Sequence, residues 1–390
     1  MLVSLNHFGL NVVRRETRSM AFGLFKKKKQ GDESAKAQSH FISLHVNKVV
    51  NETEDAISIH FDQPADGNVT YRSGQFFTIV ADINGNEVRR AYSLCSSPYT
   101  DKDLAVTVKR VEGGLMSNYL NENLKAGANL KLMPPIGNFV TDFAANNQRH
   151  VVLVGGGSGI TPLISIAKSA LDQESNSKVS LIYANRNINS IIFKSALEEL
   201  ANKYEGRFNM LHVLEETSDE IASYEGYVTK EIIENALAKL PQMPATDTVF
   251  FTCGPGPMMD VVVSSLASIG VDDSRVHKES FTSSNDKKDV EEVTDNDKIV
   301  SREVTLIYDD EEFKITVAPD ETILERGLDD DIDLPFSCQS GLCTACRGKC
   351  ISGKVKMDED EGLSDAEMEE GFVLPCVSHP MTDDVVIEIG

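Results

Sequence analysis

Short runs of alternating apolar and polar residues, separated by polar turns, characterise the first third of the chain. These runs occur at 40–50, 56–61, 74–94, 104–111 and 128–135. A period of two residues places successive side chains on opposite faces of a strand, and strands spaced about ten residues apart are typical of an antiparallel barrel or sandwich. The pattern therefore predicts an antiparallel β-barrel between about residues 41 and 143.

The rhythm changes near His150, where apolar strands begin to alternate with longer helical stretches. The apolar strands are VVLVGGG, VSLIYA, FNMLHVL and TVFFTCG. A segment with helical patterning follows each of them, near 162–171, 193–204, 229–240 and 258–269. Alternation of strand and helix makes a parallel sheet with right-handed crossovers, so this part of the chain predicts an α/β domain.

Polar and charged residues dominate 282–301, as is typical of a flexible linker. After it, REVTLIYDDEEFKITVA predicts a hairpin turning at DDEE, ETILERGLDD a short helix, and VVIEIG a closing strand. The predicted organisation is a flexible N-terminal tail over 1–39, a β-barrel over 40–145, an α/β domain over 146–282, a linker over 283–301 and a small domain over 302–390. Met20 is an alternative start within the tail.

Acidic residues outnumber basic ones, and the formal net charge is −23. Residues 302–390 hold 23 Asp and Glu against 7 Lys and Arg, so this segment alone carries −16. Nucleic acid and anionic membranes bind clustered Lys and Arg, so neither is expected as the main partner, whereas a basic protein surface fits. No stretch approaches the roughly 20 apolar residues of a spanning helix, so no stable membrane insertion is expected.

Seven cysteines, an odd number, argue against a disulfide framework and favour a reducing, cytoplasmic setting. Cys338-x4-Cys343-x2-Cys346, followed by Cys376, has the spacing of a plant-type [2Fe–2S] cluster. The alternatives are a structural zinc site, whose paired C-x2-C knuckles fit the four-residue gap poorly, and ordinary thiols. Small residues between these cysteines let backbone N–H groups approach the sulfurs. Cys350 is not required by the pattern and is expected on a strand.

The segment 302–390 resembles a plant-type ferredoxin domain of the β-grasp fold. The resemblance implies that the metal ligands are Cys338, Cys343, Cys346 and Cys376.

Two motifs in the barrel segment are similar to the flavin signatures of the ferredoxin–NADP reductase superfamily. Arg90-Ala-Tyr92-Ser93-Leu94 resembles its R-x-Y-S motif, and Gly113-Gly114-Leu115-Met116-Ser117 resembles its second flavin motif. Alone, the first motif fits any β-strand, but the two occur in order ahead of a nucleotide fold. The resemblance implies a phosphate contact for Arg90 and Ser117, ring packing for Tyr92 and a place near flavin N5 for Ser93. The flavin-binding candidates are Arg90, Tyr92, Ser93, Leu94, Gly114, Met116 and Ser117.

A glycine-rich turn, GGGSGITP at 155–162, follows the strand VVLV and opens a helix. Bare backbone N–H groups at a helix N-terminus can hold a pyrophosphate, although many such turns serve packing only. The turn departs from G-x-G-x-x-G and resembles the version in the reductase superfamily. The dinucleotide-binding candidates in this turn are Gly155, Gly156, Gly157, Gly159 and Thr161.

Further nucleotide-side candidates come from three later segments. Cys253-Gly254-Pro255 resembles the second nicotinamide-side motif, with Cys253 facing the nicotinamide or simply buried at a strand end. Glu279-Ser280-Phe281 resembles an E-x-F motif found near the flavin. Arg186, just after a strand, favours the 2′-phosphate of NADPH slightly, although a solvated loop arginine is the alternative. The predicted catalytic residues are Ser93, Cys253 and Glu279, and the other cofactor-binding candidates are Arg186, Gly254, Pro255 and Phe281.

The order of these motifs resembles that of the NAD(P)H-dependent reductase components of multicomponent oxygenases, of the phenylacetyl-CoA epoxidase type. Hydride delivers two electrons, a [2Fe–2S] cluster accepts one at a time, and a flavin between them can store the pair. The resemblance implies FAD, with FMN as an alternative, and an oxygenase, hydroxylase or desaturase partner with a di-iron or Rieske centre. A general ferredoxin or flavodoxin reductase and a non-enzymatic redox sensor remain alternative functions.

Overall fold

A computed structural model describes most of the chain beyond its N-terminal segment. The described residues are 41–64, 67–216, 221–241, 247–279, 281, 300–309, 311–319, 321–336, 338–339, 341, 343–358, 362–363 and 365–389. The expected tail over 1–39 and nearly all of the expected linker lie outside them. No helix among the described residues is both long and apolar enough to cross a membrane.

The first sheet is antiparallel and has six strands in the order β4-β3-β6-β1-β2-β5. Its strands are β1 (Ile42–Asn51), β2 (Ala56–Phe61), β3 (Phe76–Ile83), β4 (Asn86–Ser93), β5 (Leu104–Lys109) and β6 (Asn129–Ile136). A bridge between Leu94 and Val106 joins the two edges, as expected for a barrel. The helix α1 (Leu115–Asn123) follows β5, and its Met116 and Leu120 pack into the barrel core. The predicted antiparallel domain is confirmed.

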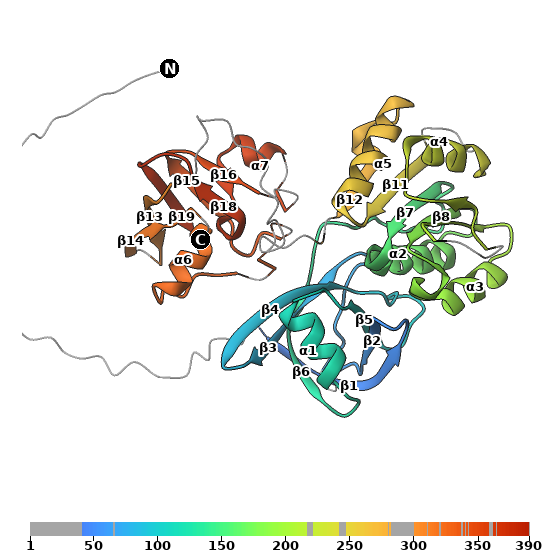
Figure 1. The fold of residues 1–390 in the computed structure, drawn as a ribbon, viewed down its shortest axis with the longest axis horizontal. Coiled ribbons are helices and arrows are strands. Elements are labelled where there is room, and N and C mark those ends of the chain that lie inside the picture. The colour runs from blue at the N-terminus through green and yellow to red at the C-terminus, as the bar shows by residue number, and fades with distance from the viewer. Residues whose placement is uncertain are drawn as a thin grey trace, which may run out of the picture. The chain divides into compact units, whose positions relative to one another are not determined.

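The second sheet is parallel throughout, in the order β10-β9-β8-β7-β11-β12. Its strands are β7 (His150–Gly156), β8 (Lys178–Asn185), β9 (Phe208–Leu214), β10 (Tyr224–Glu225), β11 (Thr248–Cys253) and β12 (Val276–Glu279). The helices α2 (Ile160–Gln173) and α3 (Lys194–Lys203) cover one face, and α4 (Lys230–Lys239) and α5 (Gly256–Ser268) cover the other (Figure 1). Every residue of β7 is buried because both faces are covered. The predicted α/β domain is confirmed.

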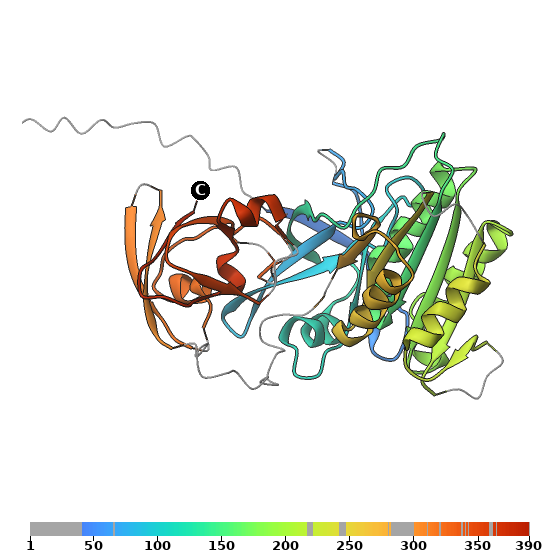
Figure 2. The same ribbon diagram turned by 90° about the horizontal axis from the view of Figure 1, so that it is seen from above.

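The C-terminal domain has a five-stranded mixed sheet in the order β14-β13-β19-β15-β17, with a small β16-β18 pair. Its strands are β13 (Arg302–Tyr308), β14 (Glu311–Val317), β15 (Gly348–Ser352), β16 (Val355–Met357), β17 (Phe372–Val373), β18 (Ser378–Pro380) and β19 (Val385–Ile389). Its helices are α6 (Ile323–Asp329) and α7 (Asp365–Glu369). Figure 2 shows the β13–β14 hairpin as two orange arrows at one edge of the sheet.

The hairpin turn differs from the prediction. Tyr308 pairs directly with Glu311, so the chain reverses over two residues rather than over the four of DDEE, and Glu311 and Glu312 belong to β14. A two-residue turn matches the twist of the strands when its residues adopt positive φ, and Asp309 has φ 53°.

Hydrogen bonds between small hydroxyl side chains join the barrel to the α/β domain. The Ser169 hydroxyl on α2 lies 2.6 Å from that of Ser73 and 2.7 Å from that of Ser97. One turn earlier, the Ser165 hydroxyl donates to the Ser96 carbonyl at 2.6 Å. All of these side chains are buried. Because buried hydroxyls must find partners, these contacts fix the barrel segments before β3 and after β4 against α2.

Candidate active site

The carboxyl ends of three neighbouring strands of the parallel sheet, β7, β11 and β12, lie next to one another. Cys253 of β11 pairs with Gly155 of β7 on one side and with Glu279 of β12 on the other. The carboxyl ends of parallel strands are where ligands bind in open α/β sheets. Cys253 is fully buried, and Glu279 is 4% exposed. The sheet thus places two of the three predicted catalytic residues side by side.

The third predicted catalytic residue reaches the same point from the barrel. Ser93 is the last residue of β4 and is 4% exposed. Its hydroxyl donates a hydrogen bond to Glu279 Oε2 at 3.3 Å, although the two residues lie far apart in the sequence. Phe281 is 40% exposed near the end of β12, while Ser280 lies outside the described residues. One hydrogen bond therefore joins the first flavin motif to the carboxyl edge of the parallel sheet.

The glycine-rich turn after β7 packs against the end of β11. A Cβ at Gly159 would overlap the carbonyl oxygen of Cys253, and a Cβ at Gly156 would lie 2.7 Å from Met258 Sδ. The Thr161 hydroxyl donates to the Ser158 carbonyl at 3.0 Å and closes the turn. No side chain caps the N-terminus of α2, and the N–H of Ile160 is bonded within the turn, to the carbonyls of Gly157 and Ser158. An anion would therefore have to bind the N–H groups of the turn itself.

The second glycine segment lies against the first. A Cβ at Gly254 would come within 2.7 Å of Met258 Cε and 3.0 Å of the Gly156 nitrogen. Pro255 is the N-cap of α5. The two glycine segments therefore pack backbone against backbone, which is possible because neither Gly156 nor Gly254 carries a side chain.

Lys109 is a cation near this turn that the sequence prediction missed. Its ammonium nitrogen lies 3.7 Å from the position of a Cβ on Gly157, and Gly157 has φ 52°. Lys109 ends β5 of the barrel, so only the contact between the domains brings it to the glycine turn. Its place just before the second flavin motif is the one signal that the sequence offered.

The first flavin motif lies along β4 and at its end. The side chain of Tyr92 packs against the barrel core, and burial raises the pKa of its hydroxyl far above the ordinary value, with Arg90 opposing this shift. Arg90 Nη1 donates to the Arg89 carbonyl at 2.7 Å. Leu94 is fully buried in the barrel core, so its side chain contributes packing. The motif thus places Arg90 and Tyr92 beside Ser93.

The second flavin motif forms the start of α1. Gly114 is the N-cap, and the Ser117 hydroxyl accepts a hydrogen bond from the Val111 nitrogen at 3.1 Å. A Cβ at Gly114 would lie 2.6 Å from this hydroxyl oxygen. The Met116 side chain is buried in the barrel core, so only its backbone can face a ligand. This helix start suits an anion because its first N–H groups point outward.

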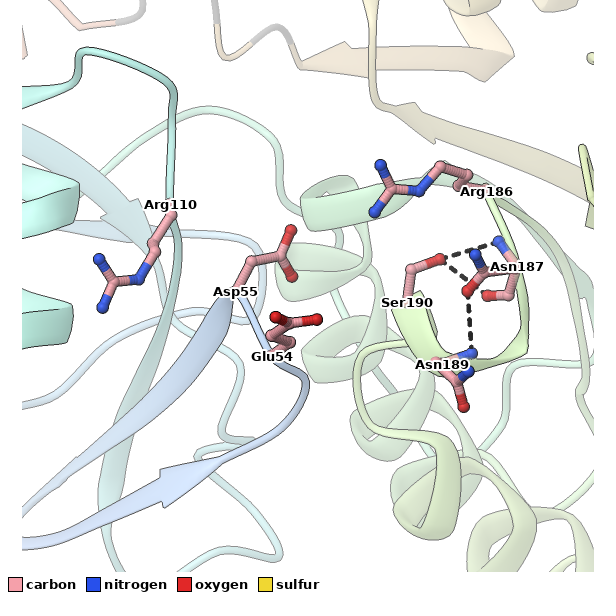
Figure 3. Close-up of a pocket in the computed structure, with 7 residues that line it drawn as sticks. All are labelled: Glu54, Asp55, Arg110, Arg186, Asn187, Asn189 and Ser190. Atoms are coloured by element: carbon pink, nitrogen blue, oxygen red, sulfur yellow. Dashed lines mark hydrogen bonds between the residues drawn. The ribbon is translucent and has the colours of Figure 1, made fainter.

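Arg186 lines a pocket between the barrel and the α/β domain (Figure 3). The pocket has a volume of about 700 Å³. Its lining residues are Glu54, Asp55 and Arg110 on the barrel side, and Arg186, Asn187, Asn189 and Ser190 on the other. Arg186 directly follows β8, so the pocket lies at the same carboxyl edge of the sheet as the glycine turn. The acidic residues of the barrel side were not predicted.

All four predicted metal ligands are buried, with 2 to 4% of each residue exposed. Their sulfurs form a connected set, because hydrogen bonds link Cys343 to Cys338, and Cys376 to both Cys338 and Cys346. These bonds, followed by burial, raise the pKa of the Cys343 and Cys376 thiols far above the ordinary value. Burial disfavours the charged thiolate form of a free cysteine, whereas a bound metal ion stabilises the thiolate form.

The loop between these ligands exposes backbone to the sulfurs. The Ala345 backbone donates a hydrogen bond to the Cys343 sulfur, which opposes the rise in its pKa. Gly341 has φ 72°, and its carbonyl accepts from the Gly362 nitrogen at 2.7 Å. Cys350 lies on β15, as predicted. Four sulfur donors with nearby backbone N–H groups are the chemistry that a [2Fe–2S] cluster requires. Among the described residues, however, no group of three or more His, Cys, Asp or Glu side chains is already arranged to hold a metal ion. The structure describes all seven cysteines, and none of them forms a disulfide.

Comparison with known proteins identifies three domain types in this order. Residues 43–141 match an oxidoreductase FAD-binding domain, 153–264 an oxidoreductase NAD-binding domain, and 306–381 a 2Fe-2S iron-sulfur cluster binding domain. The predicted set of cofactors is thereby confirmed at the level of domains. The preference for NADPH stays a prediction.

Similar proteins span nearly the whole chain. The chain is 35% identical to one component of the 1,2-phenylacetyl-CoA epoxidase of Escherichia coli, over 89% of this chain and 97% of that protein. It is 39% identical to the ferredoxin reductase component of 3-ketosteroid-9-alpha-monooxygenase of Rhodococcus rhodochrous, over 90% and 97%. The fold resembles that of phthalate dioxygenase reductase, with a TM-score of 0.58, 23% identity and coverage of 89% and 98%.

Proposed function

Because the chain belongs to the family of oxygenase reductase components that join FAD-binding, NAD-binding and 2Fe-2S domains, we propose that it carries electrons from NAD(P)H to an oxygenase. It is an oxidoreductase. The bound cofactors supply hydride acceptance and one-electron transfer, and the protein supplies their placement. The observation that carries the proposal is the Ser93–Glu279 hydrogen bond, because it joins the first flavin motif to the carboxyl edge of the parallel sheet.

Each part of the site receives a role in this proposal. Ser93 and Glu279 hold the reacting edges of flavin and nicotinamide in register, and Cys253 forms the wall beside them. Arg90 and Ser117 bind flavin phosphate groups, and Tyr92 packs against the flavin. The two glycine segments and Lys109 receive the dinucleotide pyrophosphate. The supporting observation is geometric: Ser93, Cys253, Glu279 and the two glycine segments meet at the carboxyl edge of the parallel sheet, and Lys109 reaches the first glycine segment from the end of β5.

The finer cofactor identities are also proposals. FAD is favoured over FMN by the match to an FAD-binding domain. Arg186 supports a preference for NADPH because a guanidinium suits a 2′-phosphate. The four buried cysteines Cys338, Cys343, Cys346 and Cys376 hold the [2Fe–2S] cluster. A cytoplasmic location agrees with seven cysteines that stay free of disulfides.

The partner is proposed to be an oxygenase, hydroxylase or desaturase component with a basic docking face. The similar proteins are named as components of an epoxidase and of a monooxygenase, which supports an oxygenase. Support for a basic face comes from the C-terminal domain, where Asp329, Asp331 and Asp333 are exposed along one short segment. Asp330 differs, since it pairs with Arg326.

Replacing one cluster ligand tests the proposed electron path. Cys343→Ser should abolish reduction of cytochrome c, because electrons leave through the cluster, and should leave reduction of the flavin by NAD(P)H within about twofold of the wild type. Stopped-flow absorbance under anaerobic conditions measures the flavin step, and steady-state absorbance measures cytochrome c.

Cys350→Ser is the matched control, since Cys350 is a nearby cysteine outside the proposed ligand set. It should keep both activities and the electron paramagnetic resonance signal of the reduced cluster. Equal loss of flavin reduction and cytochrome c reduction in Cys343→Ser would contradict a linear path from flavin to cluster.

A further inference from the structure

The pocket beside the end of β8 contains, besides Arg186, two acidic side chains that the proposed function leaves unused. Glu54 and Asp55 come from the turn between β1 and β2, and Arg186 comes from the loop after β8 (Figure 3). Which of these charges can act on a ligand depends on what each one already binds.

The loop after β8 satisfies most of its own polar groups. The Asn187 side chain accepts a hydrogen bond from the Asn189 nitrogen at 3.1 Å, and its amide nitrogen donates to Glu216 at 3.0 Å. The Ser190 hydroxyl donates to the Asn187 carbonyl at 2.7 Å. These bonds fix the loop. The exposed guanidinium of Arg186 has no hydrogen bond or ion pair with any residue that the structure describes.

On the barrel wall, two of the three charges are already paired. Arg110 Nη1 lies 3.0 Å from Glu122 Oε1, and Figure 3 shows its guanidinium turned away from the pocket. Lys109 Nζ lies 3.7 Å from Asp55 Oδ2. Glu54 is exposed, and within the described part of the chain its carboxylate has no partner. The pocket therefore offers a ligand the charges of Arg186 and Glu54, which no described residue pairs, from opposite walls.

These two charges have opposite effects on the adenosine end of a dinucleotide. NADPH carries a 2′-phosphate there, which Arg186 attracts and Glu54 repels. NADH carries a ribose 2′-hydroxyl, which can donate a hydrogen bond to a carboxylate. We propose that Glu54 is a specificity-determining residue that opposes Arg186 and limits the preference for NADPH. The inference rests on the proposed placement of the dinucleotide and adds a residue of the barrel to its recognition.

Binding of two small probes to the full-length protein tests this role. Adenosine 2′,5′-bisphosphate and 5′-AMP represent the adenosine ends of NADPH and NADH, and isothermal titration calorimetry at low salt measures their Kd values. Glu54→Gln should tighten binding of the bisphosphate roughly tenfold and change the Kd of 5′-AMP less than about twofold. Arg186→Gln should weaken only the bisphosphate. The ratio of kcat/KM for NADPH and NADH, with ferricyanide as acceptor, should shift in the same directions.

Glu205→Gln is the matched control, because Glu205 is an exposed carboxylate outside the pocket and the variant removes the same charge. It should leave the ratio of Kd values unchanged. If Arg186→Gln acts as expected but Glu54→Gln leaves the ratio unchanged, or only matches Glu205→Gln, the role of Glu54 is wrong while the proposed site stands. If neither probe binds the wild type, or binding ignores Arg186, the placement of the dinucleotide is wrong as well.

Discussion

At the scale of single residues, the site depends on a contact between two distant segments. The sequence motifs singled out Ser93, Cys253 and Glu279 separately. The structure adds the hydrogen bond from Ser93 to Glu279 and the pairing of Cys253 with Glu279 on neighbouring strands. A buried carboxylate needs hydrogen-bond donors, so the hydroxyl of Ser93 both donates to Glu279 and fixes the barrel at the carboxyl edge of the parallel sheet. This dual role makes the pair sensitive to small changes.

Removing the Ser93 hydroxyl should therefore impair hydride transfer more than stability. In Ser93→Ala we expect the rate of flavin reduction by NAD(P)H to fall roughly 10- to 100-fold, because Glu279 loses the hydrogen bond from Ser93 and the reacting edges lose their alignment. Anaerobic stopped-flow absorbance gives this rate, and the flavin content of the purified protein should stay near that of the wild type.

Ser58→Ala is the control for a lost buried hydroxyl. The Ser58 hydroxyl lies 2.8 Å from that of Thr107 in the same barrel, in a contact that is not part of the site. Both variants should lose about 1 kcal/mol of stability, but Ser58→Ala should keep the wild-type rate. A similar loss of rate in both variants would mean that Ser93 acts through barrel stability alone.

At the scale of elements, periodicity predicted the long strands and helices well. The barrel strands, β7 to β9, β11 and the helices α2 to α5 fall where the pattern placed them, although the pattern gave β3 and β4 as the single run 74–94. Short elements were missed, including β12, β10, β17 and α7, because two to five residues carry too little periodicity to distinguish a strand from a loop. The absence of β12 from the prediction matters most, since this strand positions Glu279 beside Cys253.

The glycine turn before α2 gives the clearest test at this scale. In Gly159→Ala the added methyl would overlap the Cys253 carbonyl, and a backbone group on a central strand cannot move aside without breaking its ladder. We expect a loss of about 3 kcal/mol or more in unfolding free energy and a failure to bind NAD(P)+. Chemical denaturation and fluorescence titration measure the two effects.

Gly256→Ala provides the contrast within the same edge of the sheet. Gly256 begins α5, and a Cβ there would meet no atom within 4 Å. This substitution should leave stability unchanged or raise it by about 0.5 kcal/mol, because alanine is the better helix former. Wild-type stability and binding in Gly159→Ala would show that the close packing of the turn is unnecessary.

At the scale of the whole molecule, the sequence predicted the order of domains and the identity of their cofactors. The four cysteines, the flavin motifs and the glycine turn can each be recognised from residue types and their spacing along the chain. The pocket at Arg186 was only half predicted, since Glu54 and Asp55 reach it from a barrel turn that is remote in the sequence. Contacts of this kind follow from the packing of two domains, which no local pattern encodes.

The charge distribution leads to a prediction about the partner. The segment 302–390 carries −16, and Asp329, Asp331 and Asp333 are exposed on it. If this surface attracts a basic acceptor, the rate of cytochrome c reduction should fall about 3- to 10-fold as ionic strength rises from about 0.02 to 0.3 M, because salt screens the attraction. Replacing all three with asparagine should lower the rate at low salt and flatten its dependence on salt.

A second triple variant separates local charge from net charge. The substitutions Glu198→Gln, Glu199→Gln and Glu205→Gln remove the same three charges from exposed positions on the α/β domain. This variant should keep the wild-type dependence on salt, whereas the aspartate variant should not, and the two should converge at high ionic strength. If the wild-type rate stays constant across this range of ionic strength, these aspartates are ordinary solvated surface. If the rates of the two variants depend equally on ionic strength, the attraction comes from the net charge of −23 and not from the C-terminal domain.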